Sequence, residues 1–134
     1  VGGTVKPNWI AIGAAWGALA VLLGALGSHV LKDRVTPEDL EIWKTGVLYH
    51  ALHAPALILF GLFAERRARG GGPGICFLLG SAIFSGTLYG MVCGGPRALG
   101  AVTPIGGLLL IAGWVWFGLL ARRSGSPGES PRET

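Results

Sequence analysis

The sequence predicts an all-α integral membrane protein, a four-helix bundle, and three observations support this fold class. Hydrophobic residues make up 51% of the 134-residue chain and charged residues only 13%, against roughly 25% charged residues in soluble domains. The charges are grouped, and uncharged stretches separate them: 25 residues after Lys6, 20 after Lys44, 27 after Arg69 and 24 after Arg97. Each stretch is long enough for a helix that crosses a bilayer, which needs about 20 residues. None has the repeating polar face of a soluble helix, which argues against a water-soluble bundle.

These stretches predict four membrane-spanning helices over about residues 8–30, 37–64, 73–93 and 103–121. A chain of this length suits one domain, so we expect residues 1–121 to form one transmembrane domain. Residues 122–134 are polar and rich in proline and serine. This composition is typical of a flexible tail.

The first two helices carry different signals. The first contains Gly13 and Gly17, and small residues four apart let helix backbones pack closely. The second helix should begin outside the membrane, because Thr36 is a good N-cap and Pro37 suits the first helical position. Within this helix Pro55 lacks an N–H group and predicts a kink.

The third and fourth helices repeat these signals. Gly86 and Gly90 are four residues apart on the third helix, and we expect them to form a second close-packing face. The fourth helix opens with Thr103 followed by proline, as the second opens with Thr36. It also contains Gly106 and Gly107, which we expect at a helix contact.

Basic residues near the membrane predict the orientation. Four spans place three chain segments on one side, and these hold six basic residues: Lys6, Arg66, Arg67, Arg69, Arg122 and Arg123. The other side holds four: Lys32, Arg34, Lys44 and Arg97. The positive-inside rule then puts both termini in the cytoplasm of a bacterial cytoplasmic (inner) membrane, or in the matrix of a mitochondrial inner membrane if the protein is eukaryotic. This asymmetry accounts for the net charge of +4, which we do not interpret as nucleic-acid binding.

Under this topology, polar residues gather in the outer half of the bilayer. The candidate site residues are His29, Tyr49, His50, His53, Ser85, Tyr89 and Thr103. Tyr49, His50 and His53 share one face of the second helix, and His29 at the outer end of the first helix is the natural residue to face them. We therefore predict one hydrogen-bonded cluster between the helices. It is also a candidate binding site, because ionisable residues inside a span are costly and often functional.

Several roles stay open for this cluster. Histidine and hydroxyl side chains tie helices together by hydrogen bonds, imidazole rings relay protons, and a haem or a lipid or quinone headgroup can bind among such groups. No metal site is predicted, because His50 and His53 are three residues apart and no carboxylate or thiolate lies at their depth. No catalytic residue is predicted, since the chain has no nucleophile elbow, His-x-x-x-His pair or phosphate loop. No cofactor is assigned.

Four motifs carry a family resemblance: LGALGSHVL, IWKTGVLYHALH, FSGTLY and TPIGGLLLIAGW, in this order. With them the chain resembles, over roughly residues 9–118, a family of small four-span membrane proteins of unknown function that includes bacterial inner-membrane proteins and human transmembrane protein 256. The resemblance implies a four-helix membrane protein and brings no accepted activity. The recurring residues of the family correspond here to Gly27, His29, Tyr49 or His50, His53, Ser85, Tyr89, Pro104, Gly106, Gly107 and Trp114. The family pattern admits His or Gln at position 50.

We therefore expect a small non-enzymatic membrane protein that packs against or stabilises other membrane components, with a membrane-protein partner or a second copy of itself. One alternative is a carrier or channel for protons or small solutes. The other is a haem- or quinone-binding accessory subunit of a larger membrane complex.

Overall fold

The structure is a computed structural model that describes residues 7–67 and 70–124, and it consists of helices joined by short turns. Helix α1 (Trp9–Leu26) continues into a π-helical turn, η1 (Gly27–Leu31). Then follow α2 (Pro37–Arg67), α3 (Gly72–Val92), a 3₁₀ turn, η2 (Arg97–Ala101), and α4 (Thr103–Ser124). The described part of the chain contains no strand, so the predicted all-α fold is confirmed.

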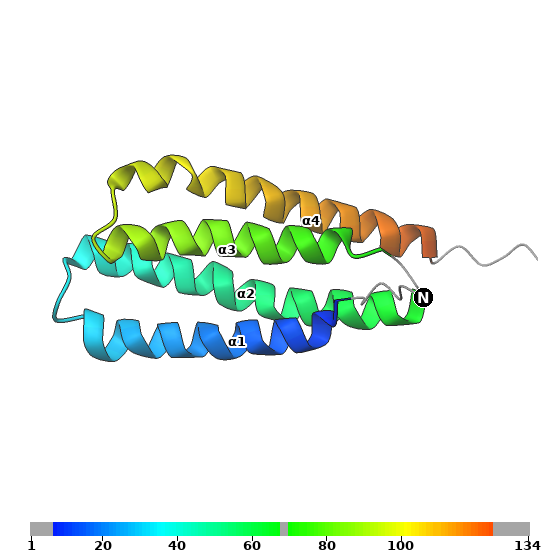
Figure 1. Ribbon diagram of the computed structural model, residues 1–134, viewed down its shortest axis with the longest axis horizontal. Helices are drawn as coiled ribbons and strands as arrows, with labels where there is room; N and C mark the ends of the chain where they lie inside the picture. The colour runs from blue at the N-terminus through cyan, green and yellow to red at the C-terminus, as the bar shows by residue number, and fades with distance from the viewer. Residues whose placement is uncertain (1–6, 68–69, 125–134) are drawn as a thin grey trace, which may run out of the picture.

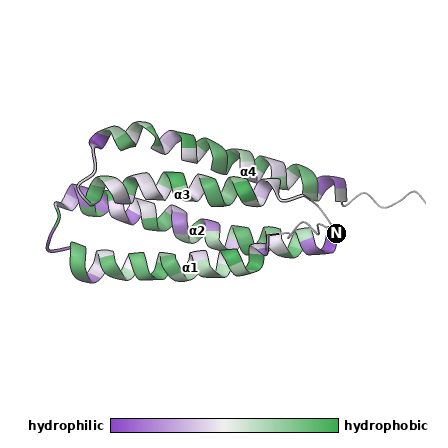
Figure 2. Cartoon of the chain, in the orientation of Figure 1, coloured by the Kyte–Doolittle hydropathy of each residue, from purple (hydrophilic) through white to green (hydrophobic). Residues whose placement is uncertain are grey.

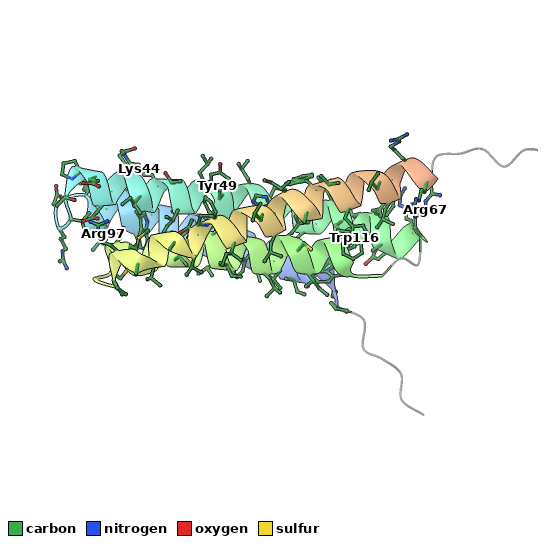
Figure 3. The ribbon with its side chains drawn as sticks, turned by 90° about the horizontal axis from the view of Figure 1, so that it is seen from above. Lys44, Tyr49, Arg67, Arg97 and Trp116 are labelled. Carbon is green, nitrogen blue, oxygen red and sulfur yellow. The ribbon has the colours of Figure 1, made fainter. Side chains whose placement is uncertain are left out.

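All four long helices are suited to a membrane. The segments Trp9–Leu31, Pro37–Arg67, Gly72–Val92 and Arg97–Arg123 are each long and apolar enough to cross a bilayer. Figure 2 shows hydrophobic residues along the middle of the helices and hydrophilic ones gathered toward their ends. In Figure 3, Lys44 and Arg97 lie at one end of the molecule and Arg67 at the other. The protein is thus a membrane-spanning bundle with charged groups at both ends.

The helices pack in chain order, α1 on α2, α2 on α3 and α3 on α4 (Figure 1). The start of α1 and the end of α4 lie at the same end, as an even number of antiparallel spans requires. The core sits in the half of the bundle toward Arg67, where Leu57 and Phe60 of α2 and Phe77 of α3 are fully buried. The central helices α2 and α3 therefore supply most of the apolar core, and α1 and α4 flank them.

The ends of the helices follow the sequence signals in part. At the start of α2, the Asp39 N–H donates to the Thr36 hydroxyl at 3.1 Å, which is the expected cap. The fourth helix differs, because Thr103 is its first residue and not a cap before it. The Thr103 hydroxyl donates to the Leu99 carbonyl at 3.3 Å. The helix also runs on to Ser124, so the first three residues of the expected flexible tail are helical. The rest of that tail, residues 125–134, lies outside the described residues.

Two of the predicted packing glycines lie where helix backbones meet. A Cβ atom on Gly13 of α1 would lie 2.9 Å from the Ala54 carbonyl oxygen of α2. A Cβ atom on Gly106 of α4 would lie 2.5 Å from the Phe84 backbone nitrogen and 2.8 Å from the Gly80 carbonyl oxygen of α3. Real Cβ contacts are longer than this, so both helix pairs approach at a distance that only glycine permits.

The other predicted glycines have looser surroundings. A Cβ atom on Gly17 would meet a side chain at 3.4 Å, and one on Gly107 would meet the ring of Phe84 at 3.7 Å. Gly90 faces Leu99 of the η2 turn rather than a long helix. Gly86 makes no close contact within the described bundle, because nothing lies within 4 Å of its Cβ position. This face of α3 is turned toward α1, which packs on α2 instead.

Candidate functional site

Hydrogen bonds between the helices form separate bridges rather than one cluster, and four of the predicted site residues take part in them: His50, His53, Tyr89 and Thr103. Each bridge joins two helices through one hydrogen bond: Trp16–Ser81 (α1 to α3), His50–Tyr89 (α2 to α3), His53–Trp114 (α2 to α4) and Thr87–Thr103 (α3 to α4). Two residues on one face of α2 thus point to different neighbours. His50 lies against Trp16 of α1 and Tyr89 of α3, whereas His53 lies against Phe77 of α3 and Trp114 of α4.

His53 is fully engaged in linking helices. Its Nδ1 atom lies 2.7 Å from the Tyr49 carbonyl oxygen, which can only accept, so Nδ1 carries the hydrogen. Its Nε2 atom then accepts from the indole N–H of Trp114 at 3.2 Å. Both ring nitrogens are satisfied, and a neutral ring is the only form that makes both bonds. His53 therefore joins α2 to α4 and has no free atom for a ligand.

Three of the predicted site residues lie away from any shared site. Tyr49 is 37% exposed, and its ring packs on Phe84 with centroids 4.3 Å apart. Its ring also stacks on that of His53 with centroids 6.4 Å apart, and its carbonyl accepts from His53, but its hydroxyl takes no part in these contacts. Thr103 bonds to Thr87 at 2.7 Å near the start of α4. The structure also corrects the placement of His29, whose side chain is exposed on the π-helical turn η1.

The distance along α1 explains the correction for His29. The residue of α1 that contacts His50 is Trp16, with ring centroids 4.4 Å apart. His29 lies thirteen residues further along the chain, which is about 20 Å at the rise of a helix. The end of α1 and the η1 turn that follows it are therefore level with the start of α2 and not with its histidines.

His50 and Ser85 form a second, different site. His50 is 2% exposed, and its Nδ1 atom lies 3.3 Å from the Tyr89 hydroxyl. Its Nε2 atom is buried and has no hydrogen-bond partner among the described residues. Ser85 is 1% exposed, and its Oγ atom is likewise buried and without a partner in the described chain. Two buried hydrogen-bonding atoms, one on α2 and one on α3, thus make no hydrogen bond of good geometry within the described chain.

Both residues line one cavity of about 140 Å³ between α1 and α3. Trp16, Leu19 and Leu23 form its wall on α1, and Ala82 and Gly86 lie beside Ser85 on α3. The lining residues carry no formal charge, and no group of three or more His, Cys, Asp or Glu residues in the described chain is placed to hold a metal ion. The cavity can therefore form hydrogen bonds with a neutral polar group and contact apolar surface. We call this cavity, with its wall residues, the α1/α3 groove.

Sequence reasoning missed Trp16 and Ser81, which the structure brings to these sites, and named Trp114 only as a recurring residue of the family. Trp16 donates its indole N–H to the Ser81 hydroxyl at 3.0 Å, and Trp114 donates to His53. Ser81 in turn donates to the Phe77 carbonyl at 2.7 Å. One signal was present in the sequence, because an indole N–H inside an apolar span needs an acceptor.

Four apolar spanning helices tied together by buried neutral hydrogen bonds define a small multi-pass membrane protein. The chain belongs to the family described as protein of unknown function DUF423, whose profile matches residues 23–107. The matched region includes His50, Ser85 and Tyr89 but neither Trp16 nor Trp114. The family resemblance predicted from the four motifs is thereby confirmed.

Curated relatives come from bacteria and yeast. The UPF0382 membrane protein YwdK of Bacillus subtilis is 36% identical over 110 residues, which cover 80% of this chain and 89% of the relative. The UPF0382 membrane protein C1782.12c of Schizosaccharomyces pombe is 40% identical over 111 residues, covering 77% and 92%. The UPF0382 inner membrane protein YgdD of Escherichia coli is 33% identical over 100 residues, covering 73% and 76%. No solved structure matches the chain. These names confirm a membrane protein and give no activity.

Proposed function

We propose that this protein is a non-enzymatic membrane protein that packs against another component of the membrane along the α1/α3 groove. One observation carries the proposal, namely that His50 Nε2 and Ser85 Oγ are buried there without partners. Inside a bilayer no water is at hand to satisfy such atoms, and leaving them unpaired costs free energy. A component that brings a polar group into the groove removes this cost.

The small residues beside Ser85 support close approach. Ala82 and Gly86 are four residues apart on α3 and both line the groove. Nothing lies within 4 Å of the Cβ position of Gly86. Small residues at this spacing allow a neighbour to reach the backbone of a membrane helix. The face of α3 that α1 leaves uncovered thus has the shape of a contact surface.

The packing of the other half of the bundle favours this role over a channel or carrier. Leu57, Phe60 and Phe77 are fully buried there and form an apolar core in the half of the bundle toward Arg67. A continuous path for protons or small solutes would have to cross this apolar core. We therefore place the role of the protein at the groove.

We further propose a bacterial cytoplasmic membrane with both termini in the cytoplasm, or a mitochondrial inner membrane with both in the matrix. Arg66, Arg67, Arg122 and Arg123 at one end of the bundle support this orientation. His50 then lies in the outer half of the bilayer, because it is closer along α2 to Lys44 than to Arg67.

Photo-crosslinking in native membranes tests the proposed function. A photoreactive residue at Ala82, in the groove, should form a specific adduct with a membrane component. The matched control is a photoreactive residue at Leu108, which is 66% exposed on the outer face of α4. Leu108 should react with bulk phospholipid only. The substitution Gly86→Leu in the same protein should abolish the Ala82 adduct, because an isobutyl group fills the groove. If Ala82 gives the same phospholipid adducts as Leu108, the proposed function is wrong.

A further inference from the structure

We infer that the component held in the α1/α3 groove is the carbonyl-bearing ring of a lipid-soluble quinone. This inference rests on the proposed function, because it names the occupant of the same groove. It is carried by three properties of the groove, which are its free hydrogen-bonding atoms, its size and its walls.

The free atoms match a carbonyl oxygen. When the Tyr89 hydroxyl donates to Nδ1 of His50 across their 3.3 Å contact, the hydrogen of the imidazole ring resides on Nε2. Nε2 then has a hydrogen to donate, and the hydroxyl of Ser85, which lines the same groove, can donate as well. A quinone carbonyl accepts two such bonds. The site presents no cation to pair with a phosphate or carboxylate, and an unpaired charge is costly inside a membrane.

The size of the groove matches one ring. Its volume is about 140 Å³, and an apolar cavity of about 150 Å³ holds a benzene molecule. The volume is too small for a whole drug-sized molecule, which takes about 300 Å³ or more. A benzoquinone headgroup therefore fits, provided that its tail lies outside the groove.

The walls provide a ring surface and an exit. Trp16 and Tyr89 supply aromatic surface, and Ala82 and Gly86 give α3 a flat face. Leu19, on the wall formed by α1, is 40% exposed on the outside of the bundle. The groove thus reaches the surface that faces lipid, where an isoprenoid tail can run into the bilayer.

The ester carbonyl of a phospholipid offers the same acceptor, and the aromatic walls favour the ring. The test is calorimetric titration of the purified full-length protein in detergent with a benzoquinone that carries a decyl tail. We expect saturable binding that a tenfold excess of phospholipid does not displace. Displacement of the quinone by phospholipid would show that the groove holds the ester carbonyl of a lipid, and the inference of a quinone ring would then be wrong.

Ser85→Ala is the decisive variant, because the Ser85 hydroxyl has no partner within the described chain. Its removal leaves nothing unpaired, so the melting temperature should not fall. Quinone binding should weaken about tenfold, the effect of losing one hydrogen bond. Ser28→Ala is the matched control, since the Ser28 hydroxyl bonds to the Gly24 carbonyl on the exposed end of α1. This control should bind as the wild type does.

Two results would overturn the inference: the absence of saturable quinone binding, or equal affinity of the Ser85→Ala variant and the wild type. The proposed function fails separately. An Ala82 adduct with a protein, together with no quinone binding, would leave a membrane partner in the groove and remove only the quinone. Adducts with bulk phospholipid alone would remove both.

Discussion

Alanine at Gly106 should destabilise the protein far more than alanine at Gly86, although both glycines lie within helices and both belong to small-residue patterns. At Gly106 the new methyl group would meet the Phe84 nitrogen at 2.5 Å and the Gly80 carbonyl oxygen at 2.8 Å. Both atoms belong to the α3 backbone and cannot rotate away, so α4 must move off α3. At Gly86 the same methyl group meets nothing within 4 Å.

The pair of variants removes the effect of helix propensity from the comparison. Replacing glycine by alanine inside a helix favours the helix by about 1 kcal/mol, and this gain is common to both variants. The steric cost of a methyl group that a packed interface cannot accept is about 1 to 3 kcal/mol. We therefore expect Gly106→Ala to have a free energy of unfolding about 1 to 3 kcal/mol lower than that of Gly86→Ala.

Unfolding with sodium dodecyl sulfate in mixed micelles, followed by circular dichroism, measures this difference. Gly86→Ala should unfold at the same detergent fraction as the wild type or at a higher one. Equal stability of the two variants would show that α3 and α4 do not approach as closely as the structure has them, and the packing argument would then fail.

The remaining predictions concern the histidines and the orientation. The effects of His53→Ala and Trp114→Phe on the free energy of unfolding should be non-additive, because each substitution removes the hydrogen bond between the two residues. We expect a coupling energy of about 0.6 to 1.7 kcal/mol in the same unfolding assay. Additive effects would contradict that hydrogen bond. His29→Ala should change the free energy of unfolding by no more than about 0.5 kcal/mol, and its effect should add to that of His53→Ala, since His29 is exposed. A larger loss, or a coupling between the two substitutions, would show that His29 contacts the buried histidines after all. Cys93 is exposed at the end of α3 and should react with a membrane-impermeant maleimide in intact cells. The control variant Cys93→Ser, which keeps the half-buried Cys76, should not react. If Cys93 reacts only after permeabilisation, the proposed orientation of the protein in the membrane is wrong.

The fold could be predicted from the sequence because charge and capping act locally. A bilayer requires long uncharged stretches whatever the neighbouring helices do, so the four spans follow from the spacing of the charges. The start of α2 was predicted for the same reason, since the Thr36 cap involves only residues of its first turn. The fourth helix starts differently because the Thr103 hydroxyl bonds to the Leu99 carbonyl and to Thr87 of α3, and the second of these contacts is not local.

The site could be predicted only in part, because its geometry depends on how each helix is rotated about its own axis. His50 and His53 are three residues apart, yet one faces the groove and the other faces α4. Gly86 and Gly106 look alike in the sequence, but only Gly106 meets the backbone of another helix. Periodicity shows which residues share a face and does not show which neighbour that face meets.

The most direct test of the proposed groove is mass spectrometry of the molecules that stay bound to the gently purified protein. Wild-type protein and the Gly86→Leu variant should be compared, because the variant fills the groove at a position with no contact within 4 Å and should keep its fold. We predict that a non-phospholipid component of the membrane, a quinone in the first instance, co-purifies with the wild type and is lost from Gly86→Leu. An identical set of bound phospholipids on both proteins would contradict the account.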